Sequence, residues 1–216
     1  MQAVIFDLDG TIVFSHPTHF KAYEKLFGEF GITWTFEEFE RVFAGTGAPK
    51  IIFDILTRSG VRDFDINALV AKKRDIFNQL MAGQRLAVVP GFFEFLGELK
   101  QRGIKKIIAS GSTTSNIHAM LANIDVLEDF PQVVSTVDDV PIPKPAPDIF
   151  LAASAILGVE PRDCLVLEDT THGVKAAKKA GMKCIAFTTT TDAEALRAAG
   201  ADLVTADYRG IPLEYI

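Results

Sequence analysis

Cysteine is scarce in this sequence, and long apolar runs and an excess of basic residues are missing. Only 2 cysteines occur in 216 residues. Cys164 and Cys184 each stand at the start of an apolar run, so we expect buried thiols on strands rather than a structural disulfide. No apolar run approaches the ~20 residues that span a bilayer, and no basic segment followed by a long apolar stretch opens the chain. These absences predict a cytoplasmic protein without a membrane partner.

The chain is acidic overall, with 28 Asp and Glu against 22 Lys and Arg and a net charge of −6. Proteins that bind the phosphate backbone of nucleic acids present a basic surface, so we expect no nucleic-acid partner. Hydrophobic residues make up 48% of the chain and charged residues 23%, which favours a folded protein with a sizeable core. The length suits one domain or one and a half, and we expect a monomer.

Short apolar segments rich in β-branched and aromatic residues predict five strands. They lie at 2–7, 104–110, 163–168, 183–187 and 201–205. Helical patterns accompany them at 91–102, 113–124, 146–159, 171–182 and 192–201. Strands that alternate with helices through short connections are typical of parallel βαβ units. We therefore predict an α/β fold with a doubly wound parallel sheet and a Rossmann-like core.

Residues 14–85 interrupt this alternation, because they lack strand-like runs and carry large apolar side chains at helical spacing. One helical stripe consists of Phe20, Tyr23, Leu26, Phe27 and Phe30. Further helical patterns lie at 35–44, 48–59 and 66–82. We predict an all-helical cap domain over 14–85, inserted into a discontinuous core of 1–13 and 86–216. The connecting segments 12–16 and 84–90 are candidate hinges.

Polar side chains gather where the predicted strands end. They are the acids Asp7, Asp9, Glu168 and Asp169, the hydroxyl pair Ser110 and Ser112, and Lys144 on the loop before a helix. Ligands of open parallel sheets bind beyond the carboxyl ends of the strands. Crowded carboxylates would raise one another's pKa values, whereas Mg²⁺, which prefers oxygen ligands, would remove that repulsion. The pattern predicts a magnesium site that handles a phosphate, with Lys144 and Ser110 on its other side.

Asp7 and Asp9, at the end of the first predicted strand, can take two different catalytic roles. Side chains two residues apart on an extended segment share a face. Asp7 can therefore attack a substrate while Asp9 donates and later accepts a proton, and Gly10 permits a sharp turn after them. Each feature also has a structural explanation, since acids at strand ends are often turn residues or helix caps. The first acid pair, the serine pair, Lys144 and the second acid pair all fall at or near the ends of successive strands, and this joint occurrence favours a functional site.

These residues resemble the motifs of the haloacid dehalogenase-like superfamily of phosphotransferases over nearly the whole chain. "DLDGT" at 7–11 resembles the first motif and Ser110 in "IIASGS" the second. Lys144 in "PKPAPDIF" resembles the third, and "LEDTTHGVKAAKKAGM" at 167–182 the fourth. The helical insertion resembles the cap of the β-phosphoglucomutase-like and sugar-phosphate phosphatase branch. Such a cap is expected to close over the site and to recognise the substrate.

The resemblance implies a role for each matching residue. Asp7 would be the nucleophile that forms an aspartyl-phosphate, and Asp9 the general acid and base with its carbonyl oxygen on Mg²⁺. Ser110 would hold the phosphoryl group together with the backbone N–H groups of Leu8 and Gly111, and Ser112 would belong to the same substrate-binding group. Lys144 would bridge the nucleophile and the phosphate. Asp7 and Asp9 would belong to the metal site, and Glu168 and Asp169 would complete it, directly or through water.

Three residues of the insertion are candidates for substrate binding. His19 in "SHPTHFKAY" matches a histidine that assists proton transfer in the mutase, although a structural histidine on a helix is equally consistent with the pattern. Gly45 and Lys50 lie in "AGTGAPK", which matches the substrate-specificity loop of the cap. The alternative for these two is a plain turn between helices with a surface lysine.

Two positions depart from the resemblance. Phe14-Ser15 stands where the branch often has an acid before the serine, and Thr11 stands where mutases usually have valine. The second departure favours a phosphatase. We therefore expect a Mg²⁺-dependent phosphatase that hydrolyses a small phosphorylated metabolite, a sugar phosphate in the first instance. A β-phosphoglucomutase-type mutase and a catalytically inactive binding protein are the alternatives.

Overall fold

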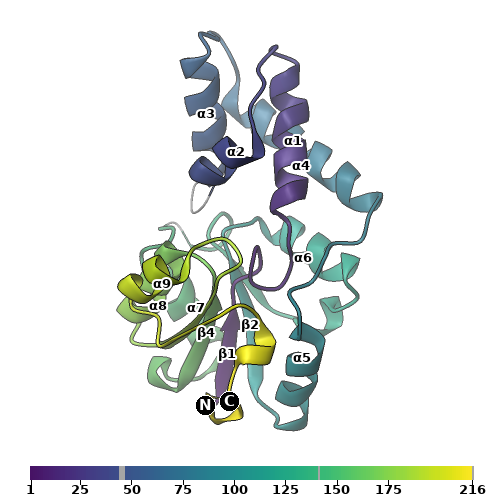
Figure 1. Cartoon of the computed structure of the whole chain (residues 1–216). Helices are drawn as coiled ribbons and strands as arrows, with labels where there is room; N and C mark the ends of the chain where they lie inside the picture. Colours follow the sequence, from purple (N-terminus) through teal and green to yellow (C-terminus); the bar gives the residue numbers. More distant parts are fainter. Residues whose placement is uncertain (44–46, 141, 216) are drawn as a thin grey trace. The chain divides into compact units, whose positions relative to one another are not determined.

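The computed structural model describes residues 1–43, 47–140 and 142–215 of the chain (Figure 1). The chain divides into two compact units. The α/β unit consists of Met1–Phe14 and Ala87–Ile216, and the helical unit of Ser15–Leu86. Within the described residues, no helix has both the length and the apolar character needed to cross a membrane.

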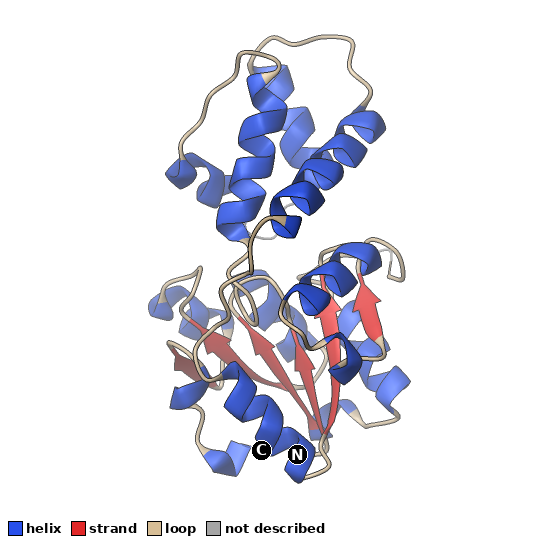
Figure 2. Ribbon diagram, turned by 90° about the vertical axis from the view of Figure 1, so that its right-hand side faces the viewer, coloured by secondary structure: helices blue, strands red, loops and turns tan. Residues whose placement is uncertain are grey.

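The α/β unit is built on a six-stranded parallel sheet with the order β3-β2-β1-β4-β5-β6 (Figure 2). The strands are β1 (Ala3–Phe6), β2 (Lys105–Ser110), β3 (Val133–Ser135), β4 (Cys164–Glu168), β5 (Lys183–Phe187) and β6 (Leu203–Thr205). This order, which reverses at β1, is that of a doubly wound Rossmann-like sheet. The predicted fold class is therefore confirmed. Strand β3 was not predicted, because it has only 3 residues and lies in a polar, turn-like context.

Helices cover both faces of the sheet (Figure 2). They are α5 (Phe92–Gln101), α6 (Thr114–Asn123), α7 (Asp148–Leu157), α8 (Thr171–Lys179) and α9 (Ala193–Ala199). Ile5 of β1 belongs to one buried cluster with apolar residues of α7, α8 and α9. The next residue, Phe6, points to the other face and meets Phe92 and Phe95 of α5 edge to face. The alternation of side chains along a strand thus explains why β1 is buried on both sides.

The register of the central strands brings three strand ends together. Phe6 is paired with Ile108 of β2 and with Leu167 of β4. One residue further on, the N–H of Asp7 still donates to the carbonyl oxygen of Leu167, at 2.9 Å. The residues that follow these strands therefore lie along one edge of the sheet, the edge at which parallel sheets bind ligands.

The helical unit contains α1 (His16–Gly28), α2 (Phe36–Phe43), α3 (Ala48–Arg58) and α4 (Ile66–Ala82) (Figure 1). Its buried core consists of Tyr23, Leu26, Phe27, Phe39, Ile51, Ile52 and Leu56. The predicted stripe of α1 is confirmed, since Phe20 and Phe30 are partly buried against this core. At the start of α4, the side chain of Asp65 accepts hydrogen bonds from the N–H groups of Asn67 and Ala68, as an N-cap residue should.

Both cysteines are buried free thiols, as predicted. Burial, with a smaller contribution from the charge of Asp163, raises the pKa of Cys164 to about 11. Burial also raises the pKa of Cys184, and the charge of Glu168 acts in the same direction. Because the thiolate is the reactive form, both side chains are chemically inert packing groups.

Candidate active site

Lys144 connects the ends of three strands of the α/β unit. Its Nζ donates hydrogen bonds to Asp7 Oδ1 at 2.6 Å, to Glu168 Oε1 at 2.7 Å and to the carbonyl oxygen of Ala109 at 3.1 Å. The ammonium group lies 4.9 Å from the centroid of the Phe150 ring. Three acceptors use all three protons of an ammonium group, so the lysine is held in one orientation between its two acids.

Glu168 is fully buried, and donors engage both of its carboxylate oxygens. Oε1 accepts from Lys144. Oε2 accepts from the N–H of Asp169 at 2.9 Å and from the N–H and hydroxyl of Thr170, both at 3.0 Å. These donors fix the orientation of the carboxylate. Glu168 therefore anchors Lys144 and the start of α8.

Asp169 has a different environment from its neighbour. It is fully buried, and its Oδ2 accepts a hydrogen bond from the Thr190 hydroxyl. Its Oδ1 has no hydrogen-bond partner in the part of the chain that the structure describes. A buried carboxylate oxygen without a donor is costly, so this atom marks a position where a ligand is expected.

The serines lie at the end of β2, on the other side of β1 from β4, and Ser112 contacts Asp9. The Ser112 hydroxyl donates to Asp9 Oδ2 at 3.1 Å, and the Ser112 N–H donates to Ser110 Oγ at the same distance. Ser110 is buried, whereas Gly111 between the two serines is exposed. The loop thus links a buried hydroxyl to the second acid of the first motif.

The Leu8 side chain is fully buried, and its carbonyl oxygen accepts from the N–H groups of Ile12 and Val13 at 2.9 and 3.1 Å. These bonds close the tight turn in which Gly10 has a φ of 78°, a value that glycine adopts without strain. The turn therefore holds the backbone of Asp7 and Asp9 in a fixed conformation. The predicted contact of the Leu8 N–H with a phosphate stays a prediction.

Burial and neighbouring charges shift the pKa values of these groups. Burial raises the pKa of Asp7 to about 7, although the charge of Lys144 lowers it, and the charges of Glu168 and Asp9 raise it further. Burial and the charges of Glu168 and Asp7 raise the pKa of Asp169 well above its usual range. Burial alone would lower the pKa of Lys144, but the charges of Asp7 and Glu168 raise it. The cluster therefore contains more negative charge than its single lysine balances.

The predicted metal site draws on four acids, one of which, Asp9, would contribute its carbonyl oxygen. Within residues 1–43, 47–140 and 142–215, no group of three or more Asp, Glu, His or Cys side chains is arranged to hold a metal ion. The predicted site takes the carbonyl oxygen of Asp9 and admits Glu168 and Asp169 directly or through water, so it stays a prediction. The oxygens of Glu168 accept hydrogen bonds from other donors, and Asp9 Oδ2 accepts one from Ser112.

A smaller donor set still fits Mg²⁺. This ion usually takes one or two carboxylates and completes its coordination with water, backbone oxygens and substrate phosphate. Asp7 and Asp169 lie close enough for the charge of one to raise the pKa of the other. The unpartnered Oδ1 of Asp169 supplies the vacant ligand atom that a cation would need, so the residues present fit the ion.

His19, in the helical unit, is buried rather than exposed on its helix. Its Nδ1 lies 2.6 Å from Nζ of Lys73 on α4, and its ring stacks on Phe77 with a centroid distance of 4.1 Å. Lys73 is itself buried, and its Nζ lies 4.6 Å from the centroid of the Tyr23 ring. The helical unit thus contains a buried cation next to an imidazole, which sequence reasoning did not identify.

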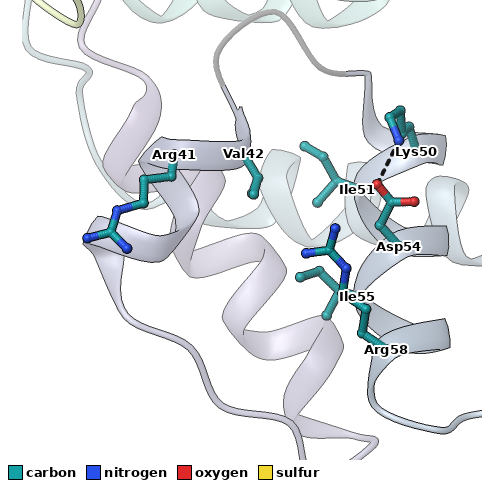
Figure 3. Close-up of a pocket in the computed structure, with 7 residues that line it drawn as sticks. All are labelled: Arg41, Val42, Lys50, Ile51, Asp54, Ile55 and Arg58. Carbon is teal, nitrogen blue, oxygen red and sulfur yellow. Dashed lines mark hydrogen bonds and ion pairs between the residues drawn. The ribbon is translucent and has the colours of Figure 1, made fainter.

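Lys50, the second candidate of the helical unit, is exposed and pairs with Asp54 at 2.7 Å. It lines a hollow of about 140 Å³ between α2 and α3 (Figure 3). The other lining residues are Arg41, Val42, Ile51, Asp54, Ile55 and Arg58. Gly45 lies outside the described residues, so its predicted contact stays a prediction.

Sequence reasoning missed two residues for which a signal existed. Lys73 occupies the buried stripe of α4 with Phe77 and Met81, and this spacing of four residues should have marked it as buried. Thr190 belongs to a run of four threonines at 188–191 that follows β5. Hydroxyl groups at a strand end deserved the same consideration as the serines after β2.

A comparison with known families and proteins agrees with this geometry. The model of the family described as haloacid dehalogenase-like hydrolase matches residues 1–181. The chain is 31% identical over 221 residues to Beta-phosphoglucomutase from Bacillus subtilis, covering 100% of this chain and 94% of that protein. It is 30% identical over 185 residues to Fructose-1-phosphate phosphatase YqaB from Escherichia coli, covering 84% and 94% respectively.

A longer relative and a solved structure extend the comparison. Protein SUPPRESSOR OF QUENCHING 1, chloroplastic, from Arabidopsis thaliana is 34% identical over 218 residues. That match covers 100% of this chain but only 20% of the length of the relative. The crystal structure of CbbY from Rhodobacter sphaeroides in complex with phosphate superposes with a TM-score of 0.85 at 29% identity, covering 96% of this chain and 94% of that one. The resemblance inferred from the motifs is thus confirmed.

Proposed function

Because the chain belongs to the haloacid dehalogenase-like hydrolase family, we propose that it is a Mg²⁺-dependent phosphatase of a small phosphorylated metabolite, a sugar phosphate. The ion pair of 2.6 Å between Lys144 and the buried Asp7 carries this proposal. The pair orients the carboxylate through Oδ1 and leaves Oδ2 to attack a substrate. The relative named Fructose-1-phosphate phosphatase supports a sugar phosphate as the substrate class.

Asp7 is the proposed nucleophile. Its carboxylate attacks phosphorus in line, the new O–P bond forms, and the bond from phosphorus to the alcohol oxygen of the substrate breaks. The product of this step is an aspartyl-phosphate. Ser110 and the N–H groups of Leu8 and Gly111 are proposed to hold the phosphoryl oxygens, since fixed donors stabilise the charge that develops on them.

Asp9 is the proposed general acid and base. In the first step it gives a proton to the departing alcohol oxygen. In the second it takes a proton from the water that attacks phosphorus, which releases phosphate and restores the Asp7 carboxylate. The hydrogen bond from the Ser112 hydroxyl to Asp9 Oδ2 supports this role, because it orients the acid towards the side of the site on which the serines lie.

Asp7, Asp169 and the carbonyl oxygen of Asp9 would hold the metal. A bound Mg²⁺ would supply positive charge that offsets the charge of the phosphate and keeps Asp7 ionised. Glu168 acts through Lys144, whose charge it balances. The helical unit is proposed to serve as the cap that recognises the substrate, with His19, Gly45 and Lys50 as the residues to test.

A β-phosphoglucomutase-type mutase is the second candidate, since a relative of that name aligns with the whole chain. A mutase returns the phosphoryl group to a second hydroxyl of the sugar, whereas a phosphatase transfers it to water. The two reactions differ in their products, so an analysis of the products distinguishes them.

The experiment incubates the full chain with Mg²⁺ and a panel of sugar monophosphates, and it follows free phosphate and sugar phosphates by ³¹P NMR. We expect phosphate release that EDTA abolishes, and a loss of at least ~10³-fold in Asp7→Asn, as for other nucleophiles. Asp163→Asn, at the residue just before β4, is the matched control and should keep full activity. Isomerised sugar phosphate without phosphate release would identify a mutase, and full activity of Asp7→Asn would refute the mechanism.

A further inference from the structure

The loop after β5 is bound to the first motif through two threonine hydroxyls. Thr189 Oγ1 donates to the carbonyl oxygen of Gly10 at 2.6 Å. Thr190 Oγ1 donates to Asp169 Oδ2 and also lies 3.1 Å from the carbonyl oxygen of Asp169. These bonds connect residues separated by 179 and 21 positions in the sequence. One short loop therefore fixes both the turn after Asp9 and the buried acid of the fourth motif.

The two oxygens of Asp169 are enclosed unequally. A methyl group at Gly10 would lie 2.0 Å from Oδ2 of Asp169 and 3.0 Å from Cγ2 of Thr190. Oδ2 is therefore packed against Gly10 and hydrogen-bonded to Thr190. Oδ1 is equally buried but has no hydrogen-bond partner within the described residues. A ligand that approaches Asp169 accordingly finds a single oxygen available.

We infer that Thr190 is a positioning residue that restricts Asp169 to ligation of a cation through Oδ1 alone, and that it thereby makes the site selective for Mg²⁺ over Ca²⁺. This inference rests on the proposed function. Mg²⁺ takes an octahedral set of single oxygens at short distances, whereas Ca²⁺ takes more ligands and readily binds both oxygens of one carboxylate. A carboxylate whose second oxygen is hydrogen-bonded to a hydroxyl can still bind Mg²⁺ through one oxygen, but it cannot readily bind Ca²⁺ through both.

The hydroxyl also affects affinity. Removal of a hydrogen bond that orients a ligating carboxylate costs about 10–100-fold in metal affinity or activity. Without the Thr190 hydroxyl, the carboxylate of Asp169 would turn more freely, and Oδ2 would need a new donor. Mg²⁺ affinity should fall, while Ca²⁺ gains access to a second oxygen of the same carboxylate.

The test measures dissociation constants of Mg²⁺ and Ca²⁺ for the metal-free full chain by isothermal titration calorimetry. Thr190→Val removes the hydroxyl at nearly constant volume, Thr190→Ser restores it, and Thr188→Val makes the matched change at an exposed threonine of the same run. We expect Thr190→Val to weaken Mg²⁺ binding by about 10-fold or more. The preference for Mg²⁺ over Ca²⁺ should fall by at least a similar factor, and both controls should behave as the wild type.

A kinetic measurement adds a second readout. The Mg²⁺ concentration for half-maximal activity should rise in Thr190→Val, whereas KM for the substrate at saturating Mg²⁺ should stay the same. Equal losses for both ions, or unchanged binding of both, would overturn the inference and leave the proposed function intact. A wild-type chain that binds no Mg²⁺ would instead overturn the proposed cation site and the inference with it.

Discussion

Lys144 of the α/β unit is largely buried, Lys73 of the helical unit is buried, and the described contacts of the two lysines differ. Lys144 of the α/β unit donates to two carboxylates, at 2.6 and 2.7 Å. The contacts of Lys73 in the helical unit include an imidazole nitrogen at 2.6 Å and the faces of two aromatic rings. The same side chain thus balances anionic charge in one unit and packs among rings in the other.

The difference shows what each unit requires of a buried cation. Removal of Lys144 would leave Asp7 and Glu168 buried together without a counter-ion, and such uncompensated charges are costly. Around Lys73, the described partners His19, Tyr23 and Phe77 are themselves stable when buried. Loss of the Lys144 charge should therefore cost more than loss of the contacts of Lys73 with these three partners.

The largest effect is expected for Lys144→Met. The substitution keeps most of the side-chain volume but leaves two buried acids unpaired, so the free energy of unfolding should fall by about 3–5 kcal/mol. Urea denaturation followed by circular dichroism without metal measures this loss. Added Mg²⁺ should recover part of it, because a cation at Asp7 replaces some of the missing charge. An unfolding free energy equal to that of the wild type would show that the two acids do not need Lys144.

The next effect concerns the space around Glu168. A methyl group at Gly173 of α8 would lie 1.8 Å from Oε1 of Glu168, whereas one at Gly97 of α5 meets no heavy atom within 4 Å. Gly173→Ala should destabilise the protein by about 1–3 kcal/mol through overpacking. Gly97→Ala should stabilise it by about 1 kcal/mol through helix propensity.

The two alanine variants are matched, since both replace a helical glycine. Differential scanning calorimetry compares their unfolding temperatures with that of the wild type. If both variants raised the unfolding temperature, the carboxylate of Glu168 would have room to move, and its proposed role as an anchor for Lys144 would fail.

The smallest effect is expected for Lys73→Met, the same substitution in the helical unit. It removes a hydrogen bond of His19 and two cation–ring contacts. The net contribution of such a hydrogen bond is about 0.5–1.5 kcal/mol, so we expect a smaller loss than in Lys144→Met. The only tryptophan of the chain, Trp34, packs against Phe27 and Tyr23 of this unit, so its fluorescence reports local unfolding. If Lys73→Met lowered the free energy of unfolding as much as Lys144→Met, the proposed difference between the two buried lysines would be refuted.

The fold could be predicted largely from short-range patterns. The apolar runs that became β1, β2, β4, β5 and β6 were visible in the sequence, and so were the helices between them. Strand β3 was missed, because Val133–Ser135 is too short to show a period and becomes a strand only by pairing with β2. The stripe on α1 was correct, but it did not reveal that Lys73 on α4 faces the same core.

The sequence predicted which residues lie together at the candidate site, but it did not predict the hydrogen bonds between them. Asp7, Lys144 and Glu168 do lie together, and Glu168 also contacts the start of α8. Its place in the metal site, directly or through water, stays a prediction. Thr190 was missed because its partner, Asp169, is 21 residues away in the sequence, and no periodic pattern relates the two positions. These outcomes depend on hydrogen bonds, whose strength changes within fractions of an ångström.

The sequence by itself determined which elements form and which polar residues collect at one edge of the sheet, because the alternation of side chains and the ends of parallel strands follow from local geometry. Only the tertiary structure decided which oxygen of each acid is engaged and which is left open. Lys144 and Asp7 are 137 residues apart, and their pairing arises from packing that no local pattern encodes.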